Sequence, residues 1–151
     1  MKGEAKGEAG FVALEQRITA PPPDVARYVR DFRNAKEWMV GVDGVEKLSD
    51  DSYRLLLESP VGKLEPEARV LERDDGRIRW EYTSIIEGGG EVTVTPEDGH
   101  SCVVAYVGDF RLKGKFLDRA ARFIGIERFA RKNGERSLLR LKHLMEARRY
   151  R

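Results

Sequence analysis

Hydrophobic and polar positions alternate strictly near the start of the chain, over residues 11–19. Val12, Leu14 and Ile18 fall on one face, and Glu15 and Arg17 fall on the other. A period of two predicts a strand with one buried face. The segment before it repeats KGEA and is small, charged and rich in glycine. We therefore expect a flexible lead-in over residues 1–10 and a single domain over 11–151.

A helical period replaces this alternation after Ala20. Prolines at 21–23 suit a first helical turn, and apolar residues then recur at steps of three and four. The pattern predicts a short amphipathic helix over residues 22–32 and a still shorter one over 34–39. Gly41 and Gly44 end the helical stretch.

Strands and turns are predicted from Val45 to Phe110. Short alternating runs favour strands over residues 45–49, 52–59, 63–73, 77–86, 91–95 and 101–112. The turns between them are expected at residues 50–51, 59–62, 75–76, 88–90 and 98–99. Two of these turns carry an Asp-Gly pair, which is a strong hairpin signal between alternating runs.

The rest of the chain, residues 113–151, returns to a helical period. Its apolar stripe consists of Phe116, Ala120, Phe123, Ala130, Leu138, Leu141 and Met145. The pattern predicts one long helix, or two segments bent near Gly125 or Gly134. Strands segregated from helices indicate an α+β fold. We expect a seven-stranded, curved antiparallel sheet wrapped on the long C-terminal helix, with two short helices after the first strand. This arrangement buries every apolar face.

Composition excludes several classes of protein. The single cysteine, Cys102, cannot form an internal disulfide or a thiolate metal cluster. Two histidines, His100 and His143, leave little for a metal site, so neither a metal nor another cofactor is expected. No apolar run reaches the roughly 18–20 residues of a membrane span, and no apolar signal region opens the chain. We therefore expect a cytoplasmic protein.

Charge is unevenly distributed along the chain. Residues 1–110 carry 14 Lys/Arg and 22 Asp/Glu, whereas residues 111–151 carry 14 and 4, so the two parts have net charges of −8 and +10. The basic segment either binds an anionic membrane or partner protein, or lies on the acidic sheet with its outer face solvated; we favour the second. The contact residues under the first interpretation are Arg119, Arg122, Lys132, Arg136 and Arg140. Nucleic acid is disfavoured because aromatic side chains for base stacking are missing there, apart from Tyr150.

The segment ITAPPPDVARYVRDFRNAKEWMVGVDGVEKL resembles the opening of the START-like, or SRPBCC, superfamily, whose helix-grip fold is shared with the birch pollen allergen. The resemblance lies in the first strand, the proline-capped helix, the aspartate–aromatic helix end, the tryptophan, and the Gly-Val that leads into the second strand. A later segment, FRLKGKFLDRAARFIG, is similar to the strand-to-helix join of the CoxG-like branch, which is associated with carbon monoxide dehydrogenase. The resemblance covers nearly all of residues 11–147.

The resemblance implies a cavity between sheet and C-terminal helix that binds a hydrophobic small molecule or lipid, a quinone-like one included. A carrier or docking role without catalysis is the favoured interpretation. The first alternative is a polyketide cyclase- or dehydratase-like enzyme of the same fold. The second is a module that docks on a membrane or a partner through the basic helix, which would make the protein peripheral at the membrane. The shared motifs are structural, so they argue for fold more strongly than for function.

Candidate residues for this cavity follow from the predicted faces. The lining is expected to include Trp38, Leu55, Leu57, Trp80, Tyr82, Asp109, Phe123, Glu127 and Gly134. Strand reversals put several turns and the start of the long helix at one end of the sheet, where we expect a mouth formed by Pro60, Gly62, Gly88, Gly89 and Phe116.

Three of these candidates have alternative interpretations. Asp109 shares strand parity with Val103 and Val107 and is either an inward polar group or, as we favour, an exposed residue at a fraying strand end. Gly134 either allows a close approach to the sheet or leaves room for a ligand. Glu127 is a polar group at the mouth or marks a bend that turns it outward.

No residue is assigned a catalytic role. A hydrolytic nucleophile needs an adjacent base, and both histidines are expected at the surface. Cys102 is expected to be a buried structural residue.

Overall fold

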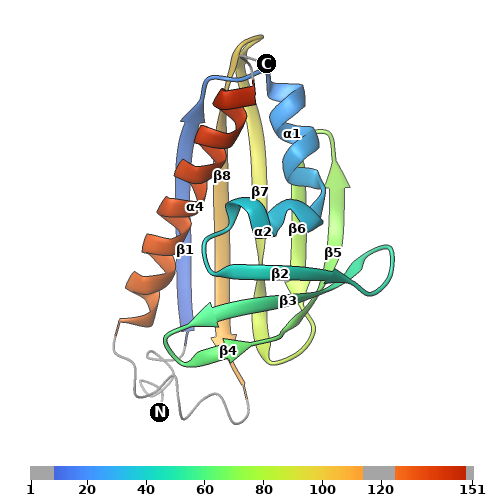
Figure 1. The fold of residues 1–151 in the computed structure, drawn as a ribbon, viewed down its shortest axis with the longest axis vertical. Coiled ribbons are helices and arrows are strands. Elements are labelled where there is room, and N and C mark those ends of the chain that lie inside the picture. Colours follow the sequence, from blue (N-terminus) through green and yellow to red (C-terminus); the bar gives the residue numbers. More distant parts are fainter. Residues whose placement is uncertain (1–8, 114–124, 149–151) are drawn as a thin grey trace.

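The computed structural model describes residues 9–113 and 125–148. A curved antiparallel sheet half-encloses one long helix, α4 (Ile126–Arg148), as Figure 1 shows. The strands follow the order β1 (Ala9–Ile18), β8 (Ser101–Leu112), β7 (Ile86–Asp98), β6 (Arg77–Tyr82), β5 (Glu67–Asp74), β3 (Ser52–Ser59) and β2 (Val42–Lys47). A short strand, β4 (Gly62–Leu64), pairs with β3 outside this order. The predicted α+β helix-grip fold is confirmed.

Two short helices cross the open side of the sheet between β1 and β2. They are α1 (Pro22–Arg30) and α2 (Ala35–Trp38), joined by the 3-10 turn η2 (Phe32–Asn34). Proline occupies the first turn of α1, as predicted, and the buried face of α1 carries Val25, Tyr28 and Val29. In Figure 1, β2 and β3 run almost crosswise to β1 and β8, so that this end of the sheet folds over toward α4.

The glycines at 88–90 do not form the predicted turn. The chain instead turns at residues 83–85, and β7 runs through all three glycines, with Gly89 opposite Asp109 and Gly90 opposite Gly108. Close backbone and side-chain approaches explain the glycines: a Cβ at Gly89 would overlap the Trp80 carbonyl, and one at Gly90 would overlap the Trp80 ring.

The single strand predicted over residues 63–73 is divided in two. β4 and β5 are separated by Glu65 and Pro66, and both pair with β3. Proline cannot donate a ladder hydrogen bond, so strand pairing is interrupted there. The predicted inward face, with Leu64, Ala68 and Val70, is nevertheless correct, since all three side chains are buried.

The C-terminal helix passes through Gly134 without a break. Gly125 has a φ of +97° directly before the first helical turn, which is a conformation that favours glycine. Of the helix predicted from residue 113, Lys113 follows β8 as non-helical backbone, and residues 114–124 lie outside the described part. Leu138, Leu141 and Met145 are buried in the main core, as the stripe predicted.

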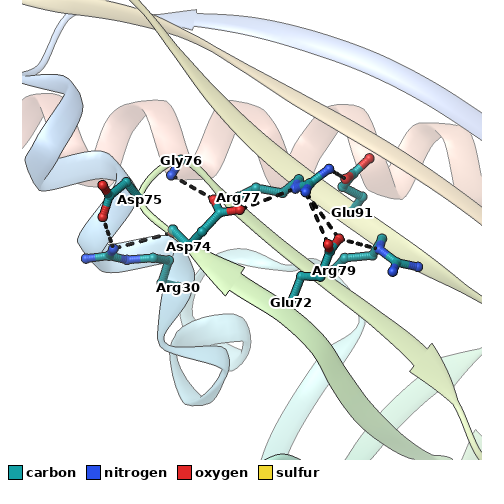
Figure 2. A network of polar contacts seen from close by, with 8 residues as sticks. All are labelled: Arg30, Glu72, Asp74, Asp75, Gly76, Arg77, Arg79 and Glu91. Atoms are coloured by element: carbon teal, nitrogen blue, oxygen red, sulfur yellow. Dashed lines mark hydrogen bonds and ion pairs between the residues drawn. The ribbon is translucent and has the colours of Figure 1, made fainter.

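The outer face of β5–β7 is covered by an ionic network (Figure 2). Arg77 contacts Glu72, Asp74 and Glu91, and Arg79 contacts Glu72 at 2.8 Å. The guanidinium of Arg79 lowers the pKa of the Glu72 carboxyl. Several acidic side chains of the sheet therefore have arginine partners from the sheet itself.

A candidate ligand cavity

A cavity of about 210 Å³ lies between the concave face of the sheet, α4 and the segment that joins α2 to β2. Seven of the nine candidate lining residues border it: Trp38, Leu55, Leu57, Trp80, Tyr82, Asp109 and Gly134. Pro60, a candidate for the mouth, also borders it. An engineered apolar cavity of about 150 Å³ binds benzene, so this space can hold a somewhat larger apolar group.

The floor of the cavity is formed where aromatic rings lie over glycines. Cross-strand pairing aligns Trp80 of β6, Gly90 of β7, Gly108 of β8 and Val12 of β1 in one row. A Cβ at Gly90 would lie 2.8 Å from Cε2 of Trp80, and one at Gly108 would lie 2.8 Å from Cζ of Tyr106. The two glycines thus allow the rings to lie flat along the sheet, and larger residues would displace them.

Tyr82, Tyr106 and Trp80 place polar groups within this mainly apolar lining. The Tyr82 and Tyr106 hydroxyls interact electrostatically with each other, and burial raises the pKa of both phenols. The buried Trp80 indole nitrogen has no hydrogen-bond partner among the described residues. The indole N–H nevertheless interacts with the Tyr82 hydroxyl. This interaction lowers the pKa of the Tyr82 phenol, but the opposite effect of burial is larger. These three groups therefore offer neutral hydrogen-bond donors.

Helix α4 is held against the α2–β2 segment by side chains at the cavity wall. The Ser137 hydroxyl accepts a hydrogen bond from the Val40 backbone N–H at 2.8 Å and donates to the Asn133 carbonyl at 2.6 Å. The Asn133 amide donates to the Val40 carbonyl at 3.4 Å. A Cβ at Gly134 would lie 2.6 Å from Cδ1 of Leu14, so the close approach of helix and sheet explains this glycine, which also borders the cavity.

A second apolar cluster closes the end of the cavity away from α1. It contains Val61, Leu64, Ile86, Leu112 and Ile126. Leu57 and Tyr82 pack against both this cluster and the main core, so the cavity is the space between two hydrophobic clusters. Ile85, beside it, has a φ of 67°, which is a strained conformation for a β-branched residue.

Charged side chains are confined to the edge of the cavity. Among the described lining residues, only Glu58 and Asp109 are charged, and both are exposed. Glu58 pairs with Lys63 at 3.6 Å. No Lys, Arg or His borders the space in the part of the chain that the structure describes.

Asp109 is exposed, as the favoured alternative stated, and it borders both the cavity and an outer groove. The structure corrects several other candidate positions. Glu127 is also in that outer groove and accepts a hydrogen bond from the Phe11 backbone N–H at 2.8 Å. Gly88 borders the groove, whereas Gly62 and Gly89 border neither space. Phe116 and Phe123 lie outside the described residues.

Many of the other lining residues were not among the candidates from the sequence, including Tyr106, Gly108, Asn133 and Ser137. Both faces of β8 are partly apolar, and its inward face carries Cys102, Val104 and Tyr106 instead of the odd-numbered residues. Gly108 was detectable as a glycine inside an alternating strand, which signals a close approach. Asn133 and Ser137 are recognisable only once α4 is placed beside Val40.

The cysteine and the two histidines lie away from the cavity. Cys102 is fully buried, as predicted, and burial raises the pKa of its thiol to about 11. His100 and His143 are exposed, also as predicted. In the described part, no group of His, Cys, Asp or Glu side chains could hold a metal ion. Across the same residues, no helix is long and apolar enough to cross a membrane.

The outer face of α4 is basic and has few partners. Lys132, Arg136 and Arg140 are exposed and form no ion pair with a carboxylate of the described residues. Leu139 lies between them and is 45% exposed. Arg119 and Arg122 lie outside the described residues. An exposed basic face is consistent with both interpretations of the charge asymmetry. Lys132, Arg136 and Arg140 form no ion pairs with the described residues of the sheet.

Comparison with solved structures places this architecture among known proteins. A START superfamily protein from Mycobacterium smegmatis has a TM-score of 0.75 and 15% identity, covering 91% of this chain and 97% of that one. A protein from Thermus thermophilus gives 0.75 and 19%, with the same coverage. The ZhuI aromatase/cyclase from a Streptomyces species gives 0.73 and 18%, over 95% of this chain and 96% of that one. At these identities the likeness shows the fold alone. No curated protein matches the sequence.

A family model supplies the assignment that the structures cannot give. The model described as "Polyketide cyclase / dehydrase and lipid transport" matches residues 12–146, which is nearly the whole chain. The match includes β1, both short helices, the rest of the sheet and almost all of α4. The finer resemblance to the CoxG-like branch stays a prediction. The chain thus belongs to the polyketide cyclase/dehydrase and lipid transport family.

Proposed function

We propose that this protein binds an apolar small molecule or lipid in the cavity between the sheet and α4, and that it acts as a carrier. The observation that carries this proposal is the apolar space of about 210 Å³ between two hydrophobic clusters. Apolar cavities with a few convergent polar groups are the usual form of small-molecule sites. The family description, which names lipid transport, supports the same class of ligand.

The chemistry of the lining favours a carrier over an enzyme. A cyclase or dehydratase moves protons, and general acid–base catalysis works best with a group whose pKa lies near the working pH. The phenols of Tyr82 and Tyr106 have raised pKa values, and no described lining residue is a Lys, Arg or His. Family membership alone keeps an enzyme as the alternative, because the same description names cyclase and dehydrase activity.

A binding experiment with a cavity-filling variant tests the carrier function. Ala130 borders the cavity on α4, whereas Ala147 is exposed near the end of the same helix. We expect Ala130→Trp to abolish binding of the neutral fluorescent probe N-phenyl-1-naphthylamine, and Ala147→Trp to leave it unchanged. Native mass spectrometry of the gently purified protein should show a bound apolar molecule in the wild type. Equal probe binding by both variants, each with a wild-type circular dichroism spectrum, would reject the cavity as the site.

A second proposal concerns the basic face of α4, formed by Lys132, Arg136 and Arg140 with Leu139. We propose that it docks on an anionic lipid surface, since exposed cations around an exposed apolar side chain suit such a surface. Each basic residue near an anionic membrane contributes about 1 kcal/mol. The double variant Arg136→Glu/Arg140→Glu should therefore lose at least about tenfold in affinity for phosphatidylglycerol vesicles at about 50 mM salt.

The control for this experiment carries the same change of charge elsewhere. Lys36 and Lys63 are exposed on α2 and β4, so Lys36→Glu/Lys63→Glu matches the charge without altering α4. Cosedimentation that both double variants weaken equally would indicate a net-charge effect. No association of the wild type at low salt would leave the basic face as a solvated surface.

A further inference from the structure

We propose that the ligand of the cavity is an uncharged molecule with a hydrogen-bond acceptor, such as a ketone oxygen, which accepts hydrogen bonds from the hydroxyls of Tyr82 and Tyr106. This inference rests on the proposed binding function and specifies the class of ligand. A hydrocarbon alone would leave both hydroxyls unpaired, and an anion would lack a cation.

The positions of the two phenols support a shared acceptor. Tyr82 projects from β6, and Tyr106 projects from β8, on either side of the glycine-rich strand β7. No side chain from β7 separates them at Gly90, and their hydroxyls are close enough to interact electrostatically. Both phenols therefore border the same space, and the proposal places one ligand oxygen between their hydroxyls.

Neither hydroxyl donates a hydrogen bond to another group of the described residues. Within residues 9–113 and 125–148, no protein group accepts a hydrogen bond from either phenol, unlike Tyr28, whose hydroxyl donates to Glu37 at 2.5 Å. The Trp80 N–H interacts with the Tyr82 hydroxyl and has no other partner among the described residues. An N–H directed at the phenol oxygen leaves the Tyr82 hydrogen for donation to a ligand. Both tyrosines are half-buried at the cavity. Once a ligand excludes water from this space, a hydroxyl without an acceptor is costly, and a ligand oxygen removes that cost.

Charge at the site disfavours an anionic ligand. Both phenols remain protonated donors, since burial raises the pKa of each. The two charged lining residues, Glu58 and Asp109, are carboxylates and would repel an anion. Burial of a carboxylate is costly unless it is paired with a cation, and no cationic side chain borders the cavity in the described part.

Three bicyclic ligands of similar size separate these possibilities: tetralin, which is a hydrocarbon, 1-tetralone, which adds a ketone, and tetrahydro-1-naphthoate, which adds a carboxylate. Affinities would be measured at pH 7 by calorimetry for the wild type, Tyr82→Phe and Tyr106→Phe. Tyr53→Phe is the matched control, because Tyr53 is buried but lies outside the cavity lining. Thermal unfolding verifies that each variant is folded, and either cavity variant suffices if the other fails to fold.

We expect each cavity variant to bind 1-tetralone about 3- to 10-fold more weakly than the wild type does, and to bind tetralin equally well. Tyr53→Phe should change neither affinity. Tetrahydro-1-naphthoate should bind the wild type at least about tenfold more weakly than 1-tetralone. An unchanged ratio of ketone to hydrocarbon affinity in both cavity variants overturns the inference. Tight binding of the carboxylate also overturns it. Both results leave the carrier function intact. No binding of tetralin or of 1-tetralone overturns the proposed function and this inference together.

Discussion

Replacing Gly90 with alanine tests the floor of the cavity directly. The added Cβ would lie 2.8 Å from Cε2 and 2.9 Å from Cη2 of Trp80, whereas non-bonded carbons prefer about 3.5–4.0 Å. The ring must therefore move by about 1 Å. Trp80 is buried, and its ring centroid lies 5.2 Å from that of Phe32 on the core side. The remaining free space is the cavity, so the ring should shift into it.

The expected cost combines two opposing effects. Overpacking of a core costs about 1–3 kcal/mol, and replacing glycine inside a strand recovers about 0.5–1 kcal/mol. A net loss of about 1–2 kcal/mol should lower the Tm by about 2–8 °C in a domain of this size. The same shift of the ring should weaken binding of N-phenyl-1-naphthylamine, because the cavity becomes smaller.

Gly99→Ala is the matched control for this prediction. Gly99 lies in the exposed turn between β7 and β8, and a Cβ there has no neighbour within 4 Å. Its Tm and probe affinity should equal those of the wild type. Differential scanning calorimetry and fluorescence titration measure both quantities. A Gly90→Ala variant as stable as Gly99→Ala, with undiminished probe affinity, would refute the close packing of Trp80 over Gly90.

Three further predictions concern other parts of the structure. Ser137→Ala should lower the urea-unfolding free energy by about 1–3 kcal/mol, because the Val40 N–H loses its acceptor, whereas exposed Ser49→Ala should have no effect; equal values would contradict the role of this hydrogen bond. Burial raises the pKa of the Cys102 thiol from 9.0 to about 11, so the unfolded chain loses this proton first as pH rises. Between about pH 8.5 and 10.5 the wild type should lose about 2 kcal/mol more stability than Cys102→Ala, and parallel pH profiles would reject this. Arg77→Met should lower the Tm at low salt and approach the wild type in roughly 1 M NaCl, since ionic contacts are screened there; a salt-independent difference would point to packing instead.

Local patterns in the sequence predicted most of the secondary structure. The alternation of Ile78, Trp80 and Tyr82 identifies the inward face of β6, because successive side chains of a strand point to opposite sides. The helical spacing of Leu138, Leu141 and Met145 likewise identifies the face of α4 that packs on the sheet. These features depend only on residues a few positions apart, so the sequence shows them directly.

The local pattern had two solutions in some segments. Both Val103–Val107 and Cys102–Tyr106 offer apolar residues at every second position of β8, so periodicity alone left its inward face open. The glycines at 88–90 suit a turn as well as a strand, and only the Trp80 ring and backbone beside them explain the strand. Glu127 was placed at the cavity by the same kind of local reasoning and instead borders the outer groove, whereas Asp109 borders both spaces.

The sequence by itself determined the order of the elements, the fold class and the apolar faces of β1, β6 and α4, because these follow from short-range periodicity and turn chemistry. Only the tertiary structure decided which residues share the cavity. Trp80, Gly90 and Gly108 form one row through strand register, and Ser137 reaches Val40 through the docking of α4. Such contacts join residues that are distant in the chain, and their geometry is set by the packing of the whole sheet around the helix.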